Sequence, residues 1–170
     1  MKTDFEGGYD MFDKFGEFDS AEEINRAAAA QLAEGDTEAV MAIALENGLD
    51  KDDAKDYIDG IVKELTTPFM AACGKLNVEE KELEPYEIMA DWVTYIRLTC
   101  EDNPDMAAAV RKKGKSLKDC LSRLLIWSMN NAKPVPDDVL KTCKINYKVT
   151  LGIPGMAKAK KLITEYYMEG

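Results

Sequence analysis

The stretch from Asp36 to Gly60 constrains the fold of this 170-residue chain more than any other part of it. Asp36 and Asp50 are suitable N-caps, and each precedes a short helix-forming segment that ends at a glycine, Gly48 or Gly60. This spacing predicts two short helices joined by a tight turn around Gly48, as in a helix-turn-helix. We interpret the pair as a helix-turn-helix-like packing unit.

The second helix of this pair is too acidic to enter a groove of DNA. A recognition helix has to offset phosphate charge, whereas residues 50–59 hold five aspartates against two lysines, a net charge of −3. Asp52, Asp56 and Asp59 fall at positions i, i+4 and i+7, which lie in one row along a helix. The sequence leaves two interpretations open, a solvated helix face or an acidic face that contacts a basic partner. The five aspartates are Asp50, Asp52, Asp53, Asp56 and Asp59.

The whole chain predicts an all-α fold, an irregular multi-helix domain with at most one short β segment near 144–153. Capping residues, prolines and apolar spacing place further helices at 20–34, 67–76, 85–100, 104–113, 116–127, 137–143 and 156–168. Residues 77–84 are expected to form an acidic connector. We divide the chain into an acidic, aromatic-rich arm (1–19), a small three-helix unit (20–66) and a larger helical body with a basic C-terminal part (67–170).

The arm has two interpretations. It holds four of the five phenylalanines of the chain, interleaved with acidic residues. The rings can pack onto the body of the protein, or the arm can be a partly disordered segment that docks on another molecule.

The residue types present argue against an enzyme. The chain has no histidine, which removes histidine-based acid–base catalysis and most zinc and copper sites. The motif Asp50-x-Asp52-Asp53 lacks the glycine and the distal glutamate of a calcium loop, so we expect no metal and no cofactor. The four cysteines are at least twenty residues apart, as in a reduced cytoplasmic protein, and we expect no secretion signal and no membrane segment.

Charge is distributed unevenly along the chain. Residues 1–60 carry a net charge of −12, residues 61–110 carry −6, and residues 111–170 carry +8. The basic residues are candidates for contacting nucleic acid, for holding the acidic half in place, or for contacting a neighbouring copy in a homo-oligomer. Further candidate acidic contacts are Glu79, Glu80, Glu82 and Glu84, and the basic candidates are Arg111, Lys112, Lys113, Lys115, Lys118, Lys158, Lys160 and Lys161.

Several segments resemble small acidic proteins from mobile elements of Firmicutes, a group that includes anti-CRISPR proteins. They are Phe18-Asp-Ser-Ala-Glu-Glu-Ile-Asn25, Glu46-Asn-Gly-Leu-Asp50 with Tyr57-Ile-Asp-Gly60, and Lys113-Gly-Lys-Ser-Leu-Lys118. The resemblance implies a non-enzymatic inhibitor, acting in the cytoplasm of a bacterial host cell. Its implied partner is a type II CRISPR effector nuclease with its guide RNA, whose nucleic-acid channel is basic.

A second resemblance is carried by Lys115-Ser-x-x-x-Cys120, which is similar to conjugative-plasmid accessory proteins. It implies an alternative function, a mobile-element accessory protein that binds DNA through its basic C-terminal face.

Overall fold

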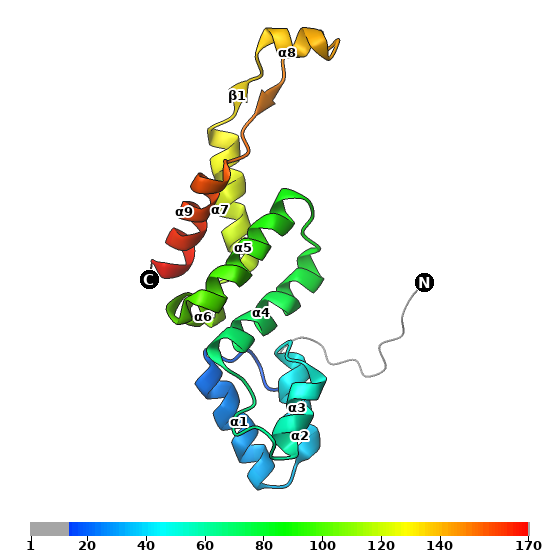
Figure 1. Ribbon diagram of the computed structural model, residues 1–170, viewed down its shortest axis with the longest axis vertical. Coiled ribbons are helices and arrows are strands. Elements are labelled where there is room, and N and C mark those ends of the chain that lie inside the picture. Colours follow the sequence, from blue (N-terminus) through cyan, green and yellow to red (C-terminus); the bar gives the residue numbers. More distant parts are fainter. Residues whose placement is uncertain (1–13, 170) are drawn as a thin grey trace, which may run out of the picture. The chain divides into compact units, whose positions relative to one another are not determined.

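The computed structural model describes residues 14–169, which form two compact helical units (Figure 1). The first unit ends at Leu117 and the second begins at Lys118. The predicted all-α fold class is confirmed, since the described residues contain helices and a single two-stranded sheet. The boundary predicted at 66/67 lies inside the first unit.

Residues 14–117 of the first unit hold six complete helices: α1 (Ala21–Ala33), α2 (Thr37–Glu46), α3 (Lys51–Ile58), α4 (Pro68–Leu83), α5 (Ile88–Asp102) and α6 (Pro104–Arg111). α7 (Leu117–Asn130) begins at the boundary. The second unit continues with β1 (Lys133–Pro134), α8 (Asp137–Thr142), β2 (Thr150–Leu151) and α9 (Met156–Met168).

The N-caps predicted for the first three helices are present. Ser20 Oγ accepts a hydrogen bond from the Glu23 N–H at 3.2 Å, and the Glu23 carboxylate accepts one from the Asp19 N–H at 2.7 Å. Asp36 and Asp50 cap α2 and α3 with their side-chain oxygens. Each helix is followed by a glycine in the left-handed region, and these are Gly35 (φ 77°), Gly48 (φ 71°) and Gly60 (φ 74°).

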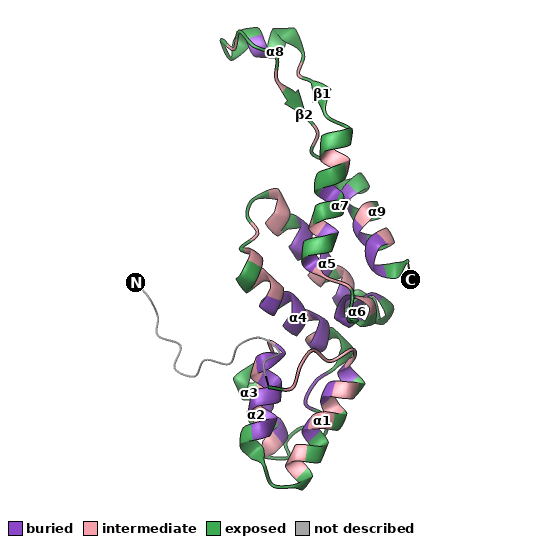
Figure 2. Cartoon of the chain, turned by 180° about the vertical axis from the view of Figure 1, so that it is seen from behind, coloured by how far each residue is buried: buried purple, intermediate pink, exposed green. Residues whose placement is uncertain are grey.

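The first three helices share one apolar core. Ile24 of α1, Val40 and Ile43 of α2, and Tyr57 of α3 are buried together in it (Figure 2). Asn25 holds the segment between α3 and α4 against α1, because its side chain both donates to the carbonyl of Thr66 and accepts from the N–H of Thr66. These three helices lie within residues 20–66, where the sequence predicts three helices.

One helix of this unit is longer than predicted. The helix that starts at Pro68 was expected to end near Leu76, yet α4 continues to Leu83. Residues 77–83 are mostly strong helix formers, and Val78 is buried, so packing holds the last turns in place. Glu84 caps the C-terminal end of the helix in a left-handed conformation (φ 46°), and a proline follows.

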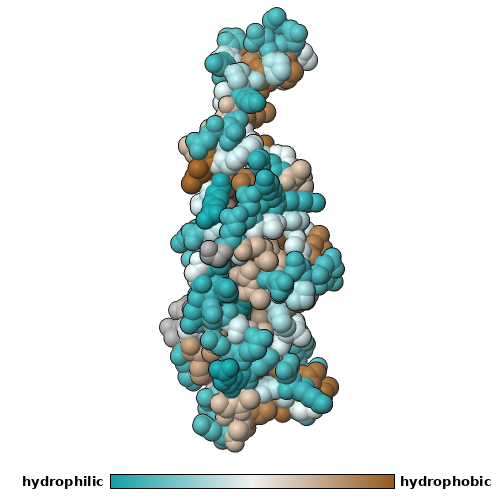
Figure 3. Space-filling view, turned by 90° about the vertical axis from the view of Figure 1, so that its left-hand side faces the viewer, coloured by the Kyte–Doolittle hydropathy of each residue, from teal (hydrophilic) through white to brown (hydrophobic). Residues whose placement is uncertain are grey.

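In the second unit α7 packs against α9, and a small extension, which we call the α8 hairpin, projects from them (Figure 1). The Arg123 guanidinium lies 5.0 Å from the centroid of the Tyr166 ring, and the Lys158 amine lies 5.7 Å from that of Trp127. The α8 hairpin consists of β1 and β2, which pair antiparallel, with α8 between them. Figure 3 shows apolar side chains beside hydrophilic ones at the α8 end. The predicted β segment near 144–153 is thus reduced to β2.

Candidate functional site

The acidic face predicted on α3 is present at the surface of the first unit. We call Asp52, Asp56 and Asp59 the acidic strip, and all three are exposed. Asp52 pairs with Lys55 at 3.2 Å, but both side chains are more than half exposed, so the pair contributes little. Asp56 and Asp59 form no ion pair with any residue in the range 14–169. The strip therefore leaves most of its negative charge exposed at the surface.

The strip lies on a firmly held helix. The opposite face of α3 buries Ala54 and Tyr57 in the core shared with α1 and α2. Asp50, which is exposed, caps the helix, with its Oδ1 accepting from the Asp52 N–H at 2.7 Å. Partial burial, and then the negative charges of the neighbouring aspartates, raise the pKa of Asp53 above its ordinary value. The aspartates are thus close enough to reinforce one another's potential.

The acidic residues at the end of α4 are divided between the interior and the surface. Glu79 Oε1 accepts a hydrogen bond from the Leu117 N–H at 3.0 Å, and Glu80 pairs with Arg97. The contact of Glu79 corrects the expectation that it binds a partner, whereas Glu80, whose side chain is 31% exposed, remains a candidate. Glu82 and Glu84 are exposed and remain candidates.

Arg111 is buried and connects several parts of the first unit. Its Nε donates to the Phe18 carbonyl at 3.0 Å, its Nη1 donates to the Ala71 carbonyl at 3.3 Å, and its Nη2 donates to Asn47 Oδ1. Burial lowers the pKa of Arg111 to about 10, so the guanidinium remains charged at neutral pH. The expectation that Arg111 contacts nucleic acid is thereby corrected, and its role matches the alternative of holding the acidic half in place.

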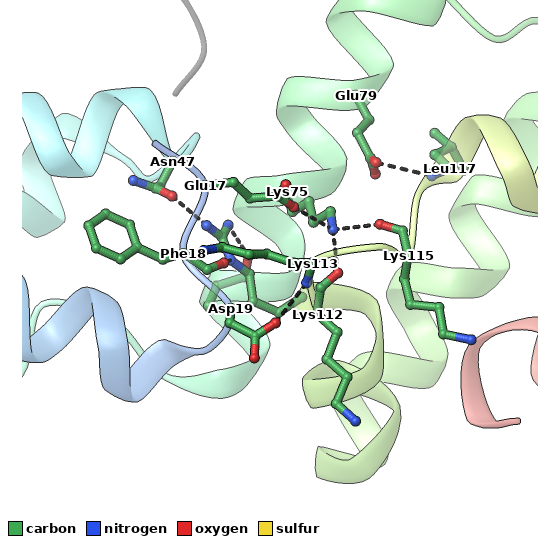
Figure 4. A network of polar contacts seen from close by, with 12 residues as sticks. Glu17, Phe18, Asp19, Asn47, Lys75, Glu79, Lys112, Lys113, Lys115 and Leu117 are labelled. Atoms are coloured by element: carbon green, nitrogen blue, oxygen red, sulfur yellow. Dashed lines mark hydrogen bonds and ion pairs between the residues drawn. The ribbon is translucent and has the colours of Figure 1, made fainter. Parts of the chain in front are cut away.

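Lys75 is a second buried cation, which sequence reasoning missed. Its Nζ donates to the carbonyls of Lys112 and Lys115 at 2.7 and 2.6 Å and pairs with the Glu17 carboxylate at 2.8 Å (Figure 4). Asp19 Oδ1 accepts from the Lys113 N–H at 2.8 Å. The single signal in the sequence is a lysine inside the otherwise apolar run from Phe69 to Leu76.

These contacts show how the described end of the arm is held. Phe15 and Phe18 pack against the core of the first three helices, and the Glu46 carboxylate accepts from the backbone N–H groups of Lys14 and Phe15. For residues 14–19, the interpretation that the arm packs onto the body is the one that fits. The other aromatic residues of the arm lie outside the described residues.

The remaining basic candidates lie at or near the surface. Lys115 is half-buried, and Lys161 pairs with Glu165 at 3.7 Å. Tyr166 and Tyr167, which could have interleaved with these lysines as stacking aromatics, are buried. The exposed basic candidates are Lys112, Lys113, Lys118, Lys158, Lys160 and Lys161.

Glu79 is expected to make the stability of the first unit depend on pH. Its Oε2 is buried without a hydrogen-bond partner within residues 14–169. Burial raises the pKa of Glu79 to about 7, although the N–H of Leu117 and the charge of Lys75 act in the opposite direction. The charges of Glu17 and Arg111 also act on it, with opposite signs.

We expect wild-type stability to fall as pH rises from about 4.5 to 7, because the folded state binds the Glu79 proton more tightly than the unfolded state. A Glu79→Gln variant has no carboxyl group to titrate, so it should not show this decrease. Its free energy of unfolding should therefore rise relative to that of the wild type by up to about 3 kcal/mol across that range. Urea unfolding at several pH values measures the difference, with Glu82→Gln as the exposed control. Parallel pH profiles for wild type and Glu79→Gln would contradict it.

The described residues offer no metal site and no membrane-spanning helix. Within 14–169, no group of three or more histidine, cysteine, aspartate or glutamate side chains is placed to hold a metal ion. No helix in that range combines the length and apolar character needed to cross a bilayer.

Comparisons with known proteins give no further identification. No family model, curated protein or solved structure matches this chain.

Proposed function

We propose that this protein is a non-enzymatic inhibitor that binds a type II CRISPR effector nuclease with its guide RNA and blocks cleavage of target DNA. The observation that carries the proposal is the acidic strip, three exposed aspartates in one row on a helix whose other face is buried. Side chains one turn apart have Cβ atoms about 5–6 Å from each other, a spacing not far from that of phosphates along a DNA strand.

The charge of the first unit supports a basic partner. Residues 1–117 contain 27 acidic and 13 basic residues, a net charge of −14, whereas residues 118–170 carry +4. A nuclease that holds a guide–target heteroduplex does so in a positively charged channel and reads its adjacent DNA motif with arginines. Complementary charge of this kind accelerates association and makes binding depend on salt.

The resemblance to anti-CRISPR proteins adds the identity of the partner. Two of the segments that carry it, 46–50 and 57–60, flank and end α3. The segment 18–25 forms the cap and first turn of α1, which packs against α2. Three of the four segments that carry the resemblance therefore belong to the three-helix unit that holds the acidic strip, and the fourth, 113–118, lies outside it.

The test is inhibition of DNA cleavage by the guide-loaded nuclease. We expect the variant Asp52→Asn/Asp56→Asn/Asp59→Asn to need about ten times more protein for half-inhibition, since exposed interfacial charges contribute modestly one by one. The matched control is Glu22→Gln/Glu34→Gln/Glu38→Gln, which removes three exposed acids of α1 and α2. Unchanged inhibition by the aspartate variant would remove α3 from the interface.

A second candidate function is a mobile-element accessory protein that binds DNA through its basic C-terminal part. The exposed lysines of α9, Lys158, Lys160 and Lys161, favour it. A gel shift with duplex DNA and the protein alone distinguishes the two candidates, because the inhibitor needs no DNA affinity of its own.

A further inference from the structure

A pocket in the second unit is lined by none of the candidate site residues described above. It has a volume of about 400 Å³, which lies in the range of small-ligand sites. α8 lines it on one side, and residues 145–148, which return toward β2, line it on the other. We call it the α8 pocket. It is mainly apolar, and its apolar lining includes Val135, Leu140 and Ile145.

The backbone around the α8 pocket is fixed by hydrogen bonds. The Ile145 N–H donates to the Leu140 carbonyl at 2.9 Å, just after Lys144 turns the chain in a left-handed conformation (φ 56°). The Val135 N–H donates to the Val149 carbonyl at 2.8 Å, which continues the β1–β2 pairing toward α8. The two walls of the pocket are therefore joined at both ends.

Tyr147 is an aromatic side chain at the edge of this pocket that is open to solvent. It is 67% exposed, whereas Tyr166 and Tyr167 of the same unit are 5% and 2% exposed. An exposed ring beside an apolar cavity provides a flat surface on which a planar group can stack. Asn146, also in the lining, offers both a donor and an acceptor to the edge of such a group.

The charged residues around the α8 pocket are mostly cationic. Lys141 and Lys148 line it together with Asp137. Lys141 pairs with Asp138 at 3.5 Å, but these side chains are 77% and 97% exposed, so the pair does not hold the lysine against a stronger ligand. Two further exposed lysines, Lys133 and Lys144, belong to the same α8 hairpin.

We propose that the α8 pocket binds a single-stranded nucleic acid, with one base stacked on Tyr147 and the flanking phosphates held by Lys141 and Lys148. An apolar pocket lined by an exposed aromatic ring and by lysines is suited to a nucleic-acid base with a phosphate on either side. Stacking aromatics within a basic groove are the usual means of binding single strands without sequence preference. This site does not rest on the inhibitor function, since it uses other residues in the other unit.

The test is fluorescence anisotropy of a labelled oligothymidylate with the full chain at low salt. We expect Tyr147→Ala to weaken binding about tenfold, within the range measured for loss of one stacked base. Tyr147→Phe keeps the ring and should bind as the wild type does, which separates stacking from folding. The matched control is Tyr86→Ala, because Tyr86 is 70% exposed but belongs to the first unit.

Salt dependence tests the role of the lysines. Lys141→Ala/Lys148→Ala should lower the slope of log affinity against log salt by about 1.4, since each phosphate contact on a single strand contributes about 0.7. Equal affinities of wild type and Tyr147→Ala, or tighter binding of duplex than of single strand, would overturn the proposal. The proposal would also be overturned if the protein bound a labelled acidic, phenylalanine-containing peptide but not the oligonucleotide.

Discussion

Replacing Arg111 by methionine is expected to destabilise the first unit by about 3–5 kcal/mol, the usual cost of removing one partner from a buried ionic network. The guanidinium donates to Asn47 and to the carbonyls of Phe18 and Ala71. Methionine fills much of the space but donates nothing, so these buried acceptors lose their hydrogen bonds to the guanidinium. The nearby carboxylate of Glu17 also loses its attraction to the guanidinium.

Arg111→Lys should fall between methionine and wild type, because lysine keeps the charge but lacks the planar fork that serves three acceptors at once. The measurement is urea unfolding followed by tryptophan fluorescence in a Trp127→Phe background. Trp92 is then the single tryptophan and reports on the first unit. The control is Lys112→Ala, an exposed side chain next in sequence, which should change stability by less than about 0.5 kcal/mol. A similar small change in Arg111→Met would show that the network does not stabilise the fold.

The second large effect is expected from Gly48→Ala, at the turn between α2 and α3. A Cβ atom there would lie 2.1 Å from the Gly74 carbonyl oxygen, a backbone atom of α4 that cannot move aside without shifting the helix. The left-handed conformation of Gly48 adds strain of about 1–2 kcal/mol for any residue with a Cβ. Together with the cost of overpacking, we expect a loss of about 3 kcal/mol or more.

Gly35 and Gly60 provide the control for this substitution. Both have φ values close to that of Gly48, yet a Cβ at either would have no atom within 4 Å. Gly35→Ala and Gly60→Ala should therefore cost only the conformational strain, about 1–2 kcal/mol. Equal losses in all three variants would show that the close approach of Gly48 to Gly74 contributes nothing. The same urea unfolding of the single-tryptophan background measures them.

The sequence predicted the features that local chemistry decides. Caps such as Ser20 and Asp36, and stops such as Gly48 and Gly60, depend on residues within one helical turn, so their pattern is visible in the chain itself. The exposure of the acidic strip follows from the same local logic. Once Ala54 and Tyr57 form the buried face of α3, the strip falls on the outer side.

The errors concern residues whose role is set by distant parts of the chain. Nothing near Glu79 in sequence indicates that it will accept from Leu117, 38 residues away. The sequence predicts Arg111 as part of a basic surface cluster. Its hydrogen-bond acceptors instead come from the C-cap of α2, from α4 and from the N-terminal arm. The length of α4 was underestimated because the burial of Val78, a tertiary effect, extends the helix beyond Leu76.

The most direct test of the central claim is the dissociation constant for the guide-loaded nuclease, measured over a series of salt concentrations. We expect wild-type affinity to fall as salt rises, and Asp52→Asn/Asp56→Asn/Asp59→Asn to bind about ten times more weakly at low salt with a shallower dependence. The control that removes three acids from α1 and α2 should follow the wild type. An aspartate variant with the same affinity and the same salt dependence as the wild type would contradict the claim that α3 is the contact surface.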